Sequence, residues 1–491
     1  MAQQRNSKST KPLSPPLLIM RKTLLYILSI ILLQSCSWFD VGAESEIDEK
    51  DMFVNADGYY TALTGIYISM GSTELYGGNL TLTALEPLSQ QYNVKEDDPD
   101  RVAWSQFRYT TDGGQELVSA IWLKMYNTIV NANMLLAKLP EAEGKIDSDV
   151  IDIIHGEALA LRSLMYFDLM RMFNESYEVN PESGNVRFKT DFGFVLGKKM
   201  SNEQLIDTII SDLMQARDYL KKDPLYCNKA YSNRYLAYDR TQRMNYYAAT
   251  ALLARMEIYR GHYAEAAQYA EEVIDSEKYR FILPEEILET DIYGVEQKAD
   301  RIFMPEMIFA LYCENILTVS RSYYEGLTGD FAKSTNAYED NDVRRAWLYQ
   351  NPSANGKINM IRYQRSVKSE DAGKYGDPVV PMLKISEMYL ILAECNLNGI
   401  ETRENALSLL NTIKQKRGEA ALPATATTQT LWNELTHEYI CDFRGEGQLF
   451  YYYKRRNLRA VDDGNYNGNT VSVPASAYVL PLPDYEKQFG Y

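Results

Sequence analysis

The chain has 491 residues and 45% of them are hydrophobic, so it can bury a sizeable core and is not disordered by composition. Its net charge of -16 repels nucleic-acid backbones, which argues against binding of DNA or RNA. The five Cys include no CxxC pair and the three His are far apart in sequence, so no metal site and no cofactor are predicted.

The N-terminus carries the features of an exported lipoprotein. Arg21 and Lys22 precede an apolar run, Leu24 to Leu33, which is too short to span a bilayer and ends in the letters LQSC at Cys36. This order resembles a bacterial lipobox, in which the Cys is acylated, for example with palmitate, after cleavage. We therefore expect residues 1–35 to be an N-terminal extension and signal peptide, with Met1 or Met20 as the start. No later run of 18 apolar residues predicts a transmembrane helix.

Helical periodicity dominates the rest of the chain. Apolar residues recur at helical spacing over 116–138 and 149–173, and Pro140 with Gly144 separates these two segments, which favours an antiparallel pair. A further amphipathic helix is predicted over 203–221, with Ser201 or Asn202 as its N-cap.

Two later segments resemble tetratricopeptide (TPR) helical hairpins. In 244–276, Ala254, Ala266 and Ala270 stand where two helices approach closely, and Gly261 stands at the turn. The segment 382–417 repeats the pattern with one extra residue in the turn. We expect each pair to leave a groove of small residues that a partner protein covers.

The remaining segments, 70–110 and 277–380, are rich in Gly, Asn, Asp, Ser and Tyr and lack a sustained period. Because a long structureless loop is rare inside a domain, short strands and functional loops are the better interpretation. The predicted fold is mostly α, with TPR-like hairpins over about 116–276 and 382–456 packed with an irregular, loop-rich half. We expect 36–491 to form a single domain.

Several helix signatures, in order, resemble the SusD/RagB family of outer-membrane lipoproteins. Trp122, Tyr126, Ile129 and Asn133 match its W-x3-Y-x2-I-x2-A-N helix, and residues 157–173 match a second helix of the family. The segments PVVPMLKISEMYLILAEC, ALSLLNTIKQKRG and YVLPLPDYE resemble later family segments. One motif departs from the family: after Glu446-Gly447, Leu449 and Tyr452 stand where Arg and Asp are usual.

The resemblance implies a SusD-like fold and a cell-surface protein without catalytic activity. Such a protein captures oligosaccharides and delivers them to a SusC-like TonB-dependent outer-membrane transporter. It is held at the outer membrane by its lipid anchor, facing the cell exterior. Three alternatives stay open: a peptide-binding uptake lipoprotein, a glycan-degrading enzyme and a scaffold that only holds a partner protein. The absence of a nucleophile motif such as GxSxG argues against the enzyme.

Aromatic residues in the two loop-rich segments are the candidate ligand contacts. Tyr and Trp rings stack on the apolar faces of sugars, while neighbouring Asn, Gln and Arg bond hydroxyl groups. We expect the segments 76–109 and 293–347 to meet in one shallow site, although each single ring can equally be core. The candidates are Tyr76, Tyr92, Trp104, Tyr109, Tyr293, Tyr323, Tyr324 and Trp347.

Two acidic patterns are interpreted as structural. Glu438, Asp442 and Glu446 fall at spacings of four, on one helix face, and are expected to pair with Lys454, Arg455 or Arg456. The run from Glu96 to Asp100 lacks the ligand spacing and the Gly of an EF-hand, which favours a solvated turn over a calcium site.

Overall fold

The computed structural model describes residues 52–193, 195–237, 239–290, 296–325, 327, 337–350, 358–364, 378–464 and 468–488. Residues Asn55–Tyr491 form one compact unit, and Met1–Val54 form a separate unit that lies almost wholly outside the described residues. The predicted signal peptide, the lipid-bearing Cys36 and Tyr293 therefore lie outside the part that the structure describes. No helix in the described ranges is both long enough and apolar enough to cross a membrane.

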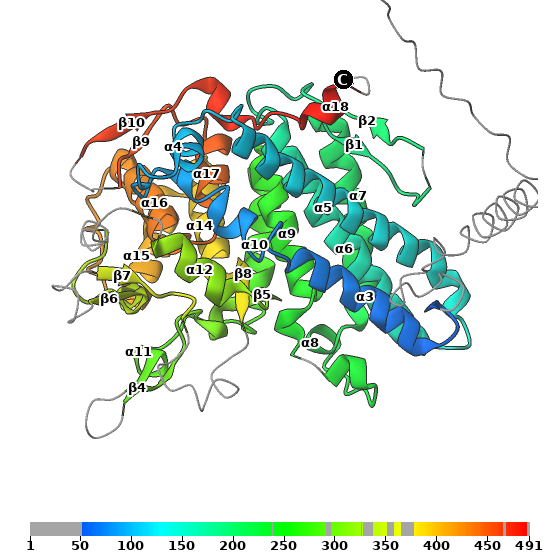
Figure 1. The fold of residues 1–491 in the computed structure, drawn as a ribbon. Coiled ribbons are helices and arrows are strands. Elements are labelled where there is room, and N and C mark those ends of the chain that lie inside the picture. Colours follow the sequence, from blue (N-terminus) through cyan, green and yellow to red (C-terminus); the bar gives the residue numbers. More distant parts are fainter. Residues whose placement is uncertain are drawn as a thin grey trace, which may run out of the picture. The chain divides into compact units, whose positions relative to one another are not determined.

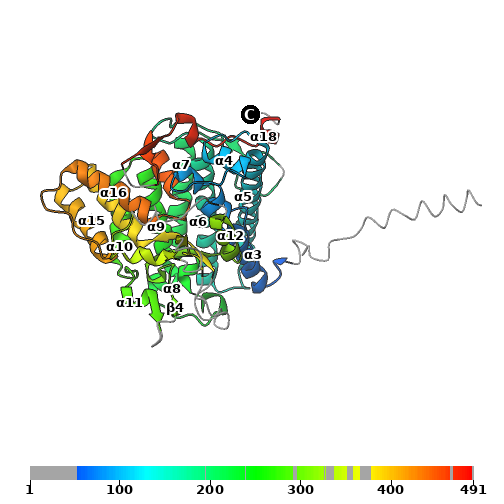
Figure 2. The same cartoon turned by 60° about the vertical axis from the view of Figure 1, so that its left-hand side comes forward.

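The fold is mostly helical, as predicted, and consecutive helices pack as neighbours (Figure 1). Figures 1 and 2 agree that α3 and α5 lie at one end of the array, α15 and α16 at the other, and α9 between them. The long helices are α3 (Ala56–Met70), α5 (Asp112–Lys138), α6 (Ser148–Phe173), α7 (Asn202–Tyr219), α9 (Tyr246–Tyr259), α10 (Tyr263–Asp275), α14 (Ile385–Leu397), α15 (Arg403–Arg417) and α16 (Thr428–Asp442).

Short polar side chains begin these helices. The Ser201 hydroxyl accepts a hydrogen bond from the Gln204 backbone amide, and the Gln204 side-chain oxygen accepts one from the Ser201 backbone amide, which confirms Ser201 as the N-cap of α7. The side chains of Thr111 and Asn245 cap α5 and α9, and each accepts a hydrogen bond from a backbone amide of the first turn. Each cap satisfies a backbone amide that would otherwise have no partner.

The TPR-like pairs are present, but their small residues do not form an open groove. Gly261 turns the chain between α9 and α10 at φ +80°, as predicted. Ala254, Ala266 and Ala270 are all fully buried, and α10 packs on both α9 and α14. The groove predicted for this first pair is therefore filled by another helix of the protein, α14. In the second pair, residues 382–384 belong to a strand and the helix starts at Ile385.

The second half contains short strands between helices, as expected for 277–380. In the described ranges the strands pair only as two-stranded antiparallel ladders. The most buried ladder joins β5 (Met307–Tyr312) to β8 (Val379–Lys384), which are distant in sequence. The other pairs are β1 (Arg187–Phe188) with β2 (Lys198–Lys199), β3 (Leu288–Thr290) with β4 (Glu296–Ala299), β6 (Leu348–Gln350) with β7 (Ile358–Met360), and β9 (Ala460–Asp462) with β10 (Thr470–Ser472).

The segments expected to be irregular also contain helices. In the first, the π-helix η2 (Asn79–Thr83), the 3-10 helix η3 (Pro87–Ser89) and α4 (Pro99–Ser105) follow α3. In the second, α12 (Ile316–Glu325) follows β5. These elements are three to ten residues long, so few periods of an apolar pattern fit in them and the sequence signal is weak.

A network of buried ion pairs joins the two halves. Arg344 contacts Asp342, Glu419 and Glu438 at 2.8–2.9 Å, and Arg417 bonds Glu306 and Asp442 at 2.6–2.8 Å. All of these side chains are nearly inaccessible to solvent. Removing one partner would leave a buried charge uncompensated, which makes the network sensitive to single substitutions.

Candidate ligand-binding site

A polar groove of about 760 Å³ runs along the segment between η3 and the end of α4. Its volume is in the range of pockets that bind small molecules. The wall offers amide, carboxylate and ammonium groups together with one aromatic ring. The lining residues are Gln90, Tyr92, Asn93, Val94, Lys95, Glu96, Asp97, Val102, Ser105 and Gln106.

Local backbone features give this groove its shape. Gln90 ends η3 in the left-handed conformation, at φ +62°, and its side-chain amide donates a hydrogen bond to the Ser105 carbonyl over 2.9 Å. Asp98 accepts from the Arg101 amide at 3.0 Å and caps α4, with Pro99 as its first residue. Within the acidic run, Glu96 and Asp97 lie in an exposed turn, as predicted, and line the groove, while Asp98 to Asp100 begin α4.

Tyr92 connects the groove to the second loop-rich segment. Tyr92 is half-buried as a residue and its hydroxyl is buried, while its ring packs edge-on against Tyr323 and at a tilt against Tyr324, with ring centroids 6.2 and 6.1 Å apart. Val94 forms an isolated bridge with Leu327 in the same region. The predicted meeting of the segments 76–109 and 293–347 is therefore present, although most of their rings lie in the interior.

A buried carboxylate lies behind Tyr92. Glu86 accepts hydrogen bonds from the amides of Gly445 and Gly447, at 2.5 and 3.1 Å. Burial raises the pKa of Glu86 to about 7, against the lowering effect of those amides and of nearby Arg444. This contact fastens the groove to the Glu446-Gly447 turn of the C-terminal helices.

The other predicted ring residues are structural in this fold. Tyr76 donates a hydrogen bond to Asp168 at 2.6 Å, and Trp104 donates to the Ala84 carbonyl at 2.7 Å. Trp347 donates to the Arg301 carbonyl at 2.8 Å. All three are buried, as are Tyr323 and Tyr324.

A buried Trp or Tyr ring presents no free face for sugar stacking. The expectation that Trp104 and Tyr323 are exposed platforms does not agree with their burial. Tyr92 is the predicted aromatic that lines the polar groove, and Asn93 and Lys95 are wall residues that the sequence reasoning missed. Only their position in a polar loop could have indicated them.

A second groove, of about 710 Å³, lies where the α4–α5 connection meets the C-terminal segment. Phe107, Tyr109, Val479 and Leu482 are among its lining residues. Tyr109 is itself buried and donates a hydrogen bond to the Ala477 carbonyl at 2.5 Å. The ring predicted as a ligand contact therefore forms part of the base of this groove and ties the C-terminal segment to the body.

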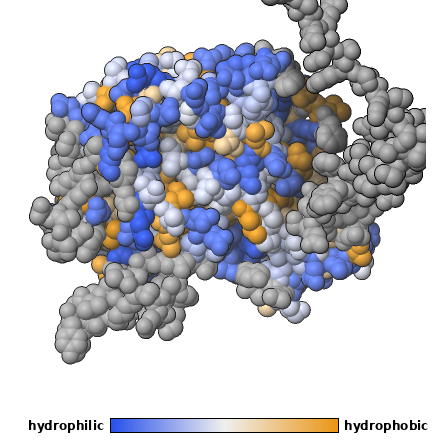
Figure 3. Space-filling model, in the orientation of Figure 1, coloured by the Kyte–Doolittle hydropathy of each residue, from blue (hydrophilic) through white to orange (hydrophobic). Residues whose placement is uncertain are grey.

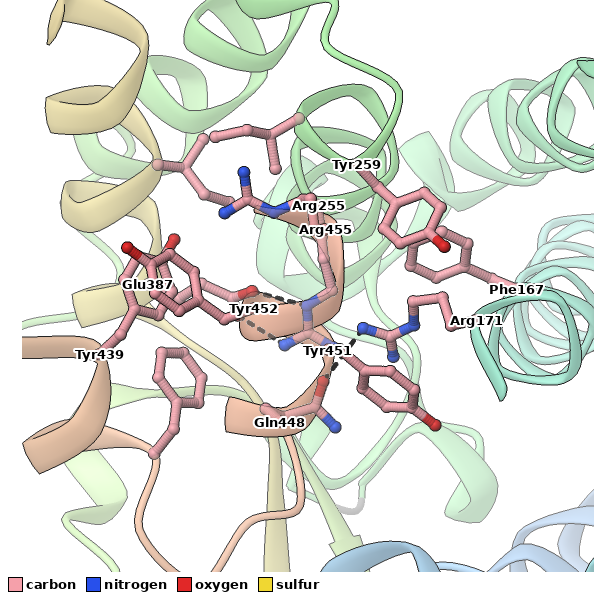
Figure 4. Close-up of a pocket in the computed structure, with 13 residues that line it drawn as sticks. Phe167, Arg171, Arg255, Tyr259, Glu387, Tyr439, Gln448, Tyr451, Tyr452 and Arg455 are labelled. Atoms are coloured by element: carbon pink, nitrogen blue, oxygen red, sulfur yellow. Dashed lines mark hydrogen bonds and ion pairs between the residues drawn. The ribbon is translucent and has the colours of Figure 1, made fainter. Parts of the chain in front are cut away.

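A third, internal cavity of about 30 Å³ has room for a buried water but not for a sugar (Figure 4). Arg171 lies between the rings of Phe167 and Tyr451 and donates to Gln448 at 3.3 Å. Arg255 is paired with Glu387 on the opposite side of the cavity. Because its charges are paired within the protein, we interpret this cavity as part of the core.

The acidic residues of the last helices are paired, but with other partners than predicted. Glu438 pairs with Arg344, and Glu446 with Arg362 and Lys384. Lys454 instead donates to backbone carbonyls at the end of α6, and burial lowers its pKa. The predicted helix face is also incomplete, because α16 ends at Asp442, before Glu446.

Three carboxylates in this network lie within reach of one metal ion. The oxygen atoms of Glu419, Glu434 and Glu438 are all within 4.8 Å of one another. The Lys414 ammonium donates to Glu419 at 2.5 Å and to Glu434 at 2.8 Å, so a cation of the protein already lies among them. The geometry is that of an ion-pair network.

The face of the molecule seen in Figure 3 is largely hydrophilic. Figure 3 shows the face of Figure 1 with apolar residues scattered between polar ones. A face of this kind suits a ligand that is recognised through hydrogen bonds more than through apolar burial.

Comparison with known proteins identifies the fold. Residues 61–258 match the family model described as "Starch-binding associating with outer membrane", and residues 315–479 match the model of the SusD family. SusD-like protein P2 of Formosa agariphila is 22% identical over 409 residues, which cover 78% of this chain and 74% of that protein.

Solved structures agree with these matches. A SusD superfamily protein from Bacteroides thetaiotaomicron has a TM-score of 0.66 at 21% identity, over 89% of this chain and 98% of its own. A SusD-like carbohydrate binding protein from Bacteroides vulgatus has a TM-score of 0.66 at 16% identity, over 88% of this chain and 96% of its own. With the ordered helix motifs and the helical fold, these matches show that the chain belongs to the SusD/RagB family.

Proposed function

We propose that this protein is a nutrient-uptake lipoprotein that binds oligosaccharides at the outer surface of the outer membrane. It passes them to a SusC-like TonB-dependent transporter. The observation that carries the proposal is the polar groove along residues 90–106 in a chain of the SusD/RagB family. The groove combines one half-buried aromatic residue, Tyr92, with side chains that donate and accept hydrogen bonds, which is the chemistry needed for sugar recognition.

A binding role is favoured over catalysis by the position of the carboxylates. Glycoside hydrolysis needs two carboxyl groups on opposite sides of the scissile bond, one of them a proton donor. Glu96 and Asp97 are neighbours in sequence on one wall of the groove, and Glu86, whose pKa is raised, is buried behind Tyr92 and bonded to backbone amides. This arrangement supports recognition without turnover.

Peptide uptake is the second candidate. Lys95, Glu96 and Asp97 bring charges of both signs into the groove wall, and such charges pair well with the termini and side chains of peptides. An uncharged sugar would gain less binding energy from these charged side chains.

The test is titration calorimetry with oligosaccharides and with short peptides, using Asn93→Ala and Gln106→Ala. Each lost hydrogen bond should weaken binding of the cognate oligosaccharide by about 3- to 10-fold. Gln429→Ala, on the exposed face of α16, is the matched control and should bind normally. Equal affinity of all three variants would move the site away from this groove, and binding of peptides alone would favour the second candidate.

The partner is tested separately. Gently solubilised native membranes should yield the protein together with a TonB-dependent barrel. Consistent isolation of the protein alone would contradict the transporter part of the proposal.

A further inference from the structure

The hairpin β1–β2 exposes an apolar tip that the fold does not cover. Val195 is 76% and Leu196 is 69% exposed, and Phe192 beside them is 38% exposed. Adjacent large apolar side chains are rarely exposed together on one loop of a soluble protein. Such exposure indicates that the loop contacts an apolar partner. By comparison, the apolar residues on the face shown in Figure 3 are scattered between polar ones.

The base of this hairpin is firmly attached to the helices. The Tyr126 hydroxyl donates to the Arg187 carbonyl and accepts from the Arg187 amide, both at 3.0 Å. The Tyr166 hydroxyl bonds the carbonyl and amide of Lys189 in the same way, both at 2.9 Å. Asn133 adds a bond to the Lys189 carbonyl at 3.0 Å. The tip is therefore presented from α5 and α6 on a fixed support.

The loop is also closed from within. The Lys189 ammonium donates to the carbonyls of Gly193 and Val195, the latter at 2.6 Å. A Cβ on Gly197 would stand 2.7 Å from the Phe188 carbonyl oxygen, so the strands meet closely only because this residue is Gly. These contacts close the described part of the loop, and Val195 and Leu196 remain exposed to solvent.

The charge of the hairpin is opposite to that of the whole chain. Residues 187–199 contain four basic side chains, Arg187, Lys189, Lys198 and Lys199, and a single acidic one, Asp191, in a chain of net charge -16. Lys198 and Lys199 are exposed on β2. Because salt screens charges beyond roughly 8–10 Å, an approaching surface responds to this local positive charge and not to the total.

From these observations we infer that the β1–β2 tip inserts into an anionic lipid surface. Apolar side chains flanked by Lys and Arg are the combination that binds the interface of a membrane, where the rings and aliphatic groups enter the acyl boundary and the cations meet lipid phosphates. The inference rests on the proposed function, since it requires the protein to work at a membrane.

Insertion of the tip would complement the predicted N-terminal lipid. Figure 1 shows the β1–β2 hairpin and the first turn of α3 on the same, right-hand side of the compact unit, and α3 is the element to which the N-terminal segment is joined. A lipid tether fixes one point of a protein and leaves it free to rotate. A second contact at the hairpin would set the orientation of the compact unit on the membrane.

The experiment uses the mature chain from residue 37 without lipid, which contains the whole compact unit. It is sedimented with vesicles of phosphatidylcholine mixed with phosphatidylglycerol, and with phosphatidylcholine alone. We expect binding to the mixed vesicles, weaker binding at high salt, and loss of about tenfold or more in Val195→Ser combined with Leu196→Ser. Lys198→Glu combined with Lys199→Glu should weaken binding to the mixed vesicles only.

The matched control replaces two exposed apolar residues elsewhere, Met214→Ser with Leu283→Ser, and should bind as the unchanged chain does. Thermal unfolding of each variant checks that it is folded. The inference is overturned if the unchanged chain ignores mixed vesicles, or if the Val195 and Leu196 variant binds them equally well. Loss of a co-purifying transporter in that variant, without vesicle binding by the unchanged chain, would assign the tip to a protein contact instead.

Failure of this inference and failure of the proposed function are distinguishable. Oligosaccharide titration of the same hairpin variants reports on the groove at residues 90–106, which the hairpin does not line. Vesicle binding with no sugar binding would sink the proposed function alone, and the reverse result would sink the membrane-insertion proposal alone.

Discussion

At the scale of single residues, aromatic side chains with polar tips account for much of the interior. Trp104 packs its ring against Tyr109, with centroids 4.8 Å apart, while its indole N–H reaches the Ala84 carbonyl. The same amphipathic chemistry that suits a sugar also suits a short helix that must be fastened to a neighbouring turn. Composition cannot separate the two uses, because they differ only in which side of the ring meets solvent.

We predict that Trp104→Ala destabilises the protein by about 3–5 kcal/mol, because it removes a buried ring and a hydrogen bond. The free energy of unfolding in urea is the measurement. Trp104→Phe keeps most of the packing and should lose much less. Normal stability of Trp104→Ala with loss of oligosaccharide binding would contradict the structural role and return the ring to the ligand site.

Burial of Glu86 predicts a pH dependence of stability. The folded-state pKa is raised to about 7 from 4.5, so the unfolded chain loses its proton first as the pH rises. The stability that protonated Glu86 contributes is complete below about pH 4.5 and is lost as the pH rises through about 7. The shift corresponds to roughly 3 kcal/mol.

Glu86→Gln should therefore remove this part of the pH dependence. We expect the variant to gain stability relative to the unchanged protein between pH 5 and pH 8, measured by urea unfolding at each pH. Other titrating groups are common to both proteins and cancel in the difference. An unchanged difference at the two pH values would show that Glu86 is ionised in the folded state throughout.

At the scale of elements, close approaches of backbone determine which segments can meet. Gly447, in the turn before α17 (Leu449–Arg455), has φ +68°, and a Cβ there would stand 2.0 Å from the Leu80 carbonyl oxygen in η2. Gly447 also donates its amide to Glu86. The Glu446-Gly447 motif thus joins the C-terminal helices to the first loop-rich segment, beside the candidate groove.

We predict that Gly447→Ala lowers stability by several kcal/mol, on the order of 3 or more, since both the left-handed backbone and the collision with η2 oppose a side chain. Gly399→Ala is the matched control. Gly399 turns the chain between α14 and α15 at φ +93° with open space around its Cβ position, so only about 1 kcal/mol should be lost. Equal losses in urea unfolding would show that contact with Leu80 is not restrictive.

At the scale of the whole molecule, the compact helical unit is expected to work while tethered at the cell surface. The basic residues, short apolar run and LQSC letters before residue 37 predict that Cys36 carries the lipid. A lipidated N-terminus would hold the candidate groove near a transporter and raise the local concentration of captured ligand.

We predict that Cys36→Ala releases the protein from outer-membrane fractions after a high-salt wash, because the acyl chains have lost their attachment atom. Immunoblotting of fractionated cells is the measurement. Cys227→Ala removes an exposed thiol in the folded unit and should leave membrane association unchanged. Retention of the Cys36 variant in the washed membrane would contradict lipid anchoring at this residue.

The sequence alone was sufficient for the helical architecture and the family. Helices α5, α6 and α7 follow the predicted segments because long apolar periods and N-cap residues are local signals, which no distant contact has to supply. The turn at Gly261 is local for the same reason. Leu449 and Tyr452, which stand where the family has Arg and Asp, are both buried among the C-terminal helices, so the loss of both charges leaves no unpaired charge there.

Only the tertiary structure decided which residues face solvent. The pairing of Glu438 with Arg344, and of β5 with β8, joins positions far apart in the chain, and no spacing rule connects them. The same holds for the rings: Tyr92 reaches a groove while Tyr323 beside it is buried, because exposure depends on how the two loop-rich segments pack together. Local sequence determines the elements, and long-range packing determines the surface on which a ligand can bind.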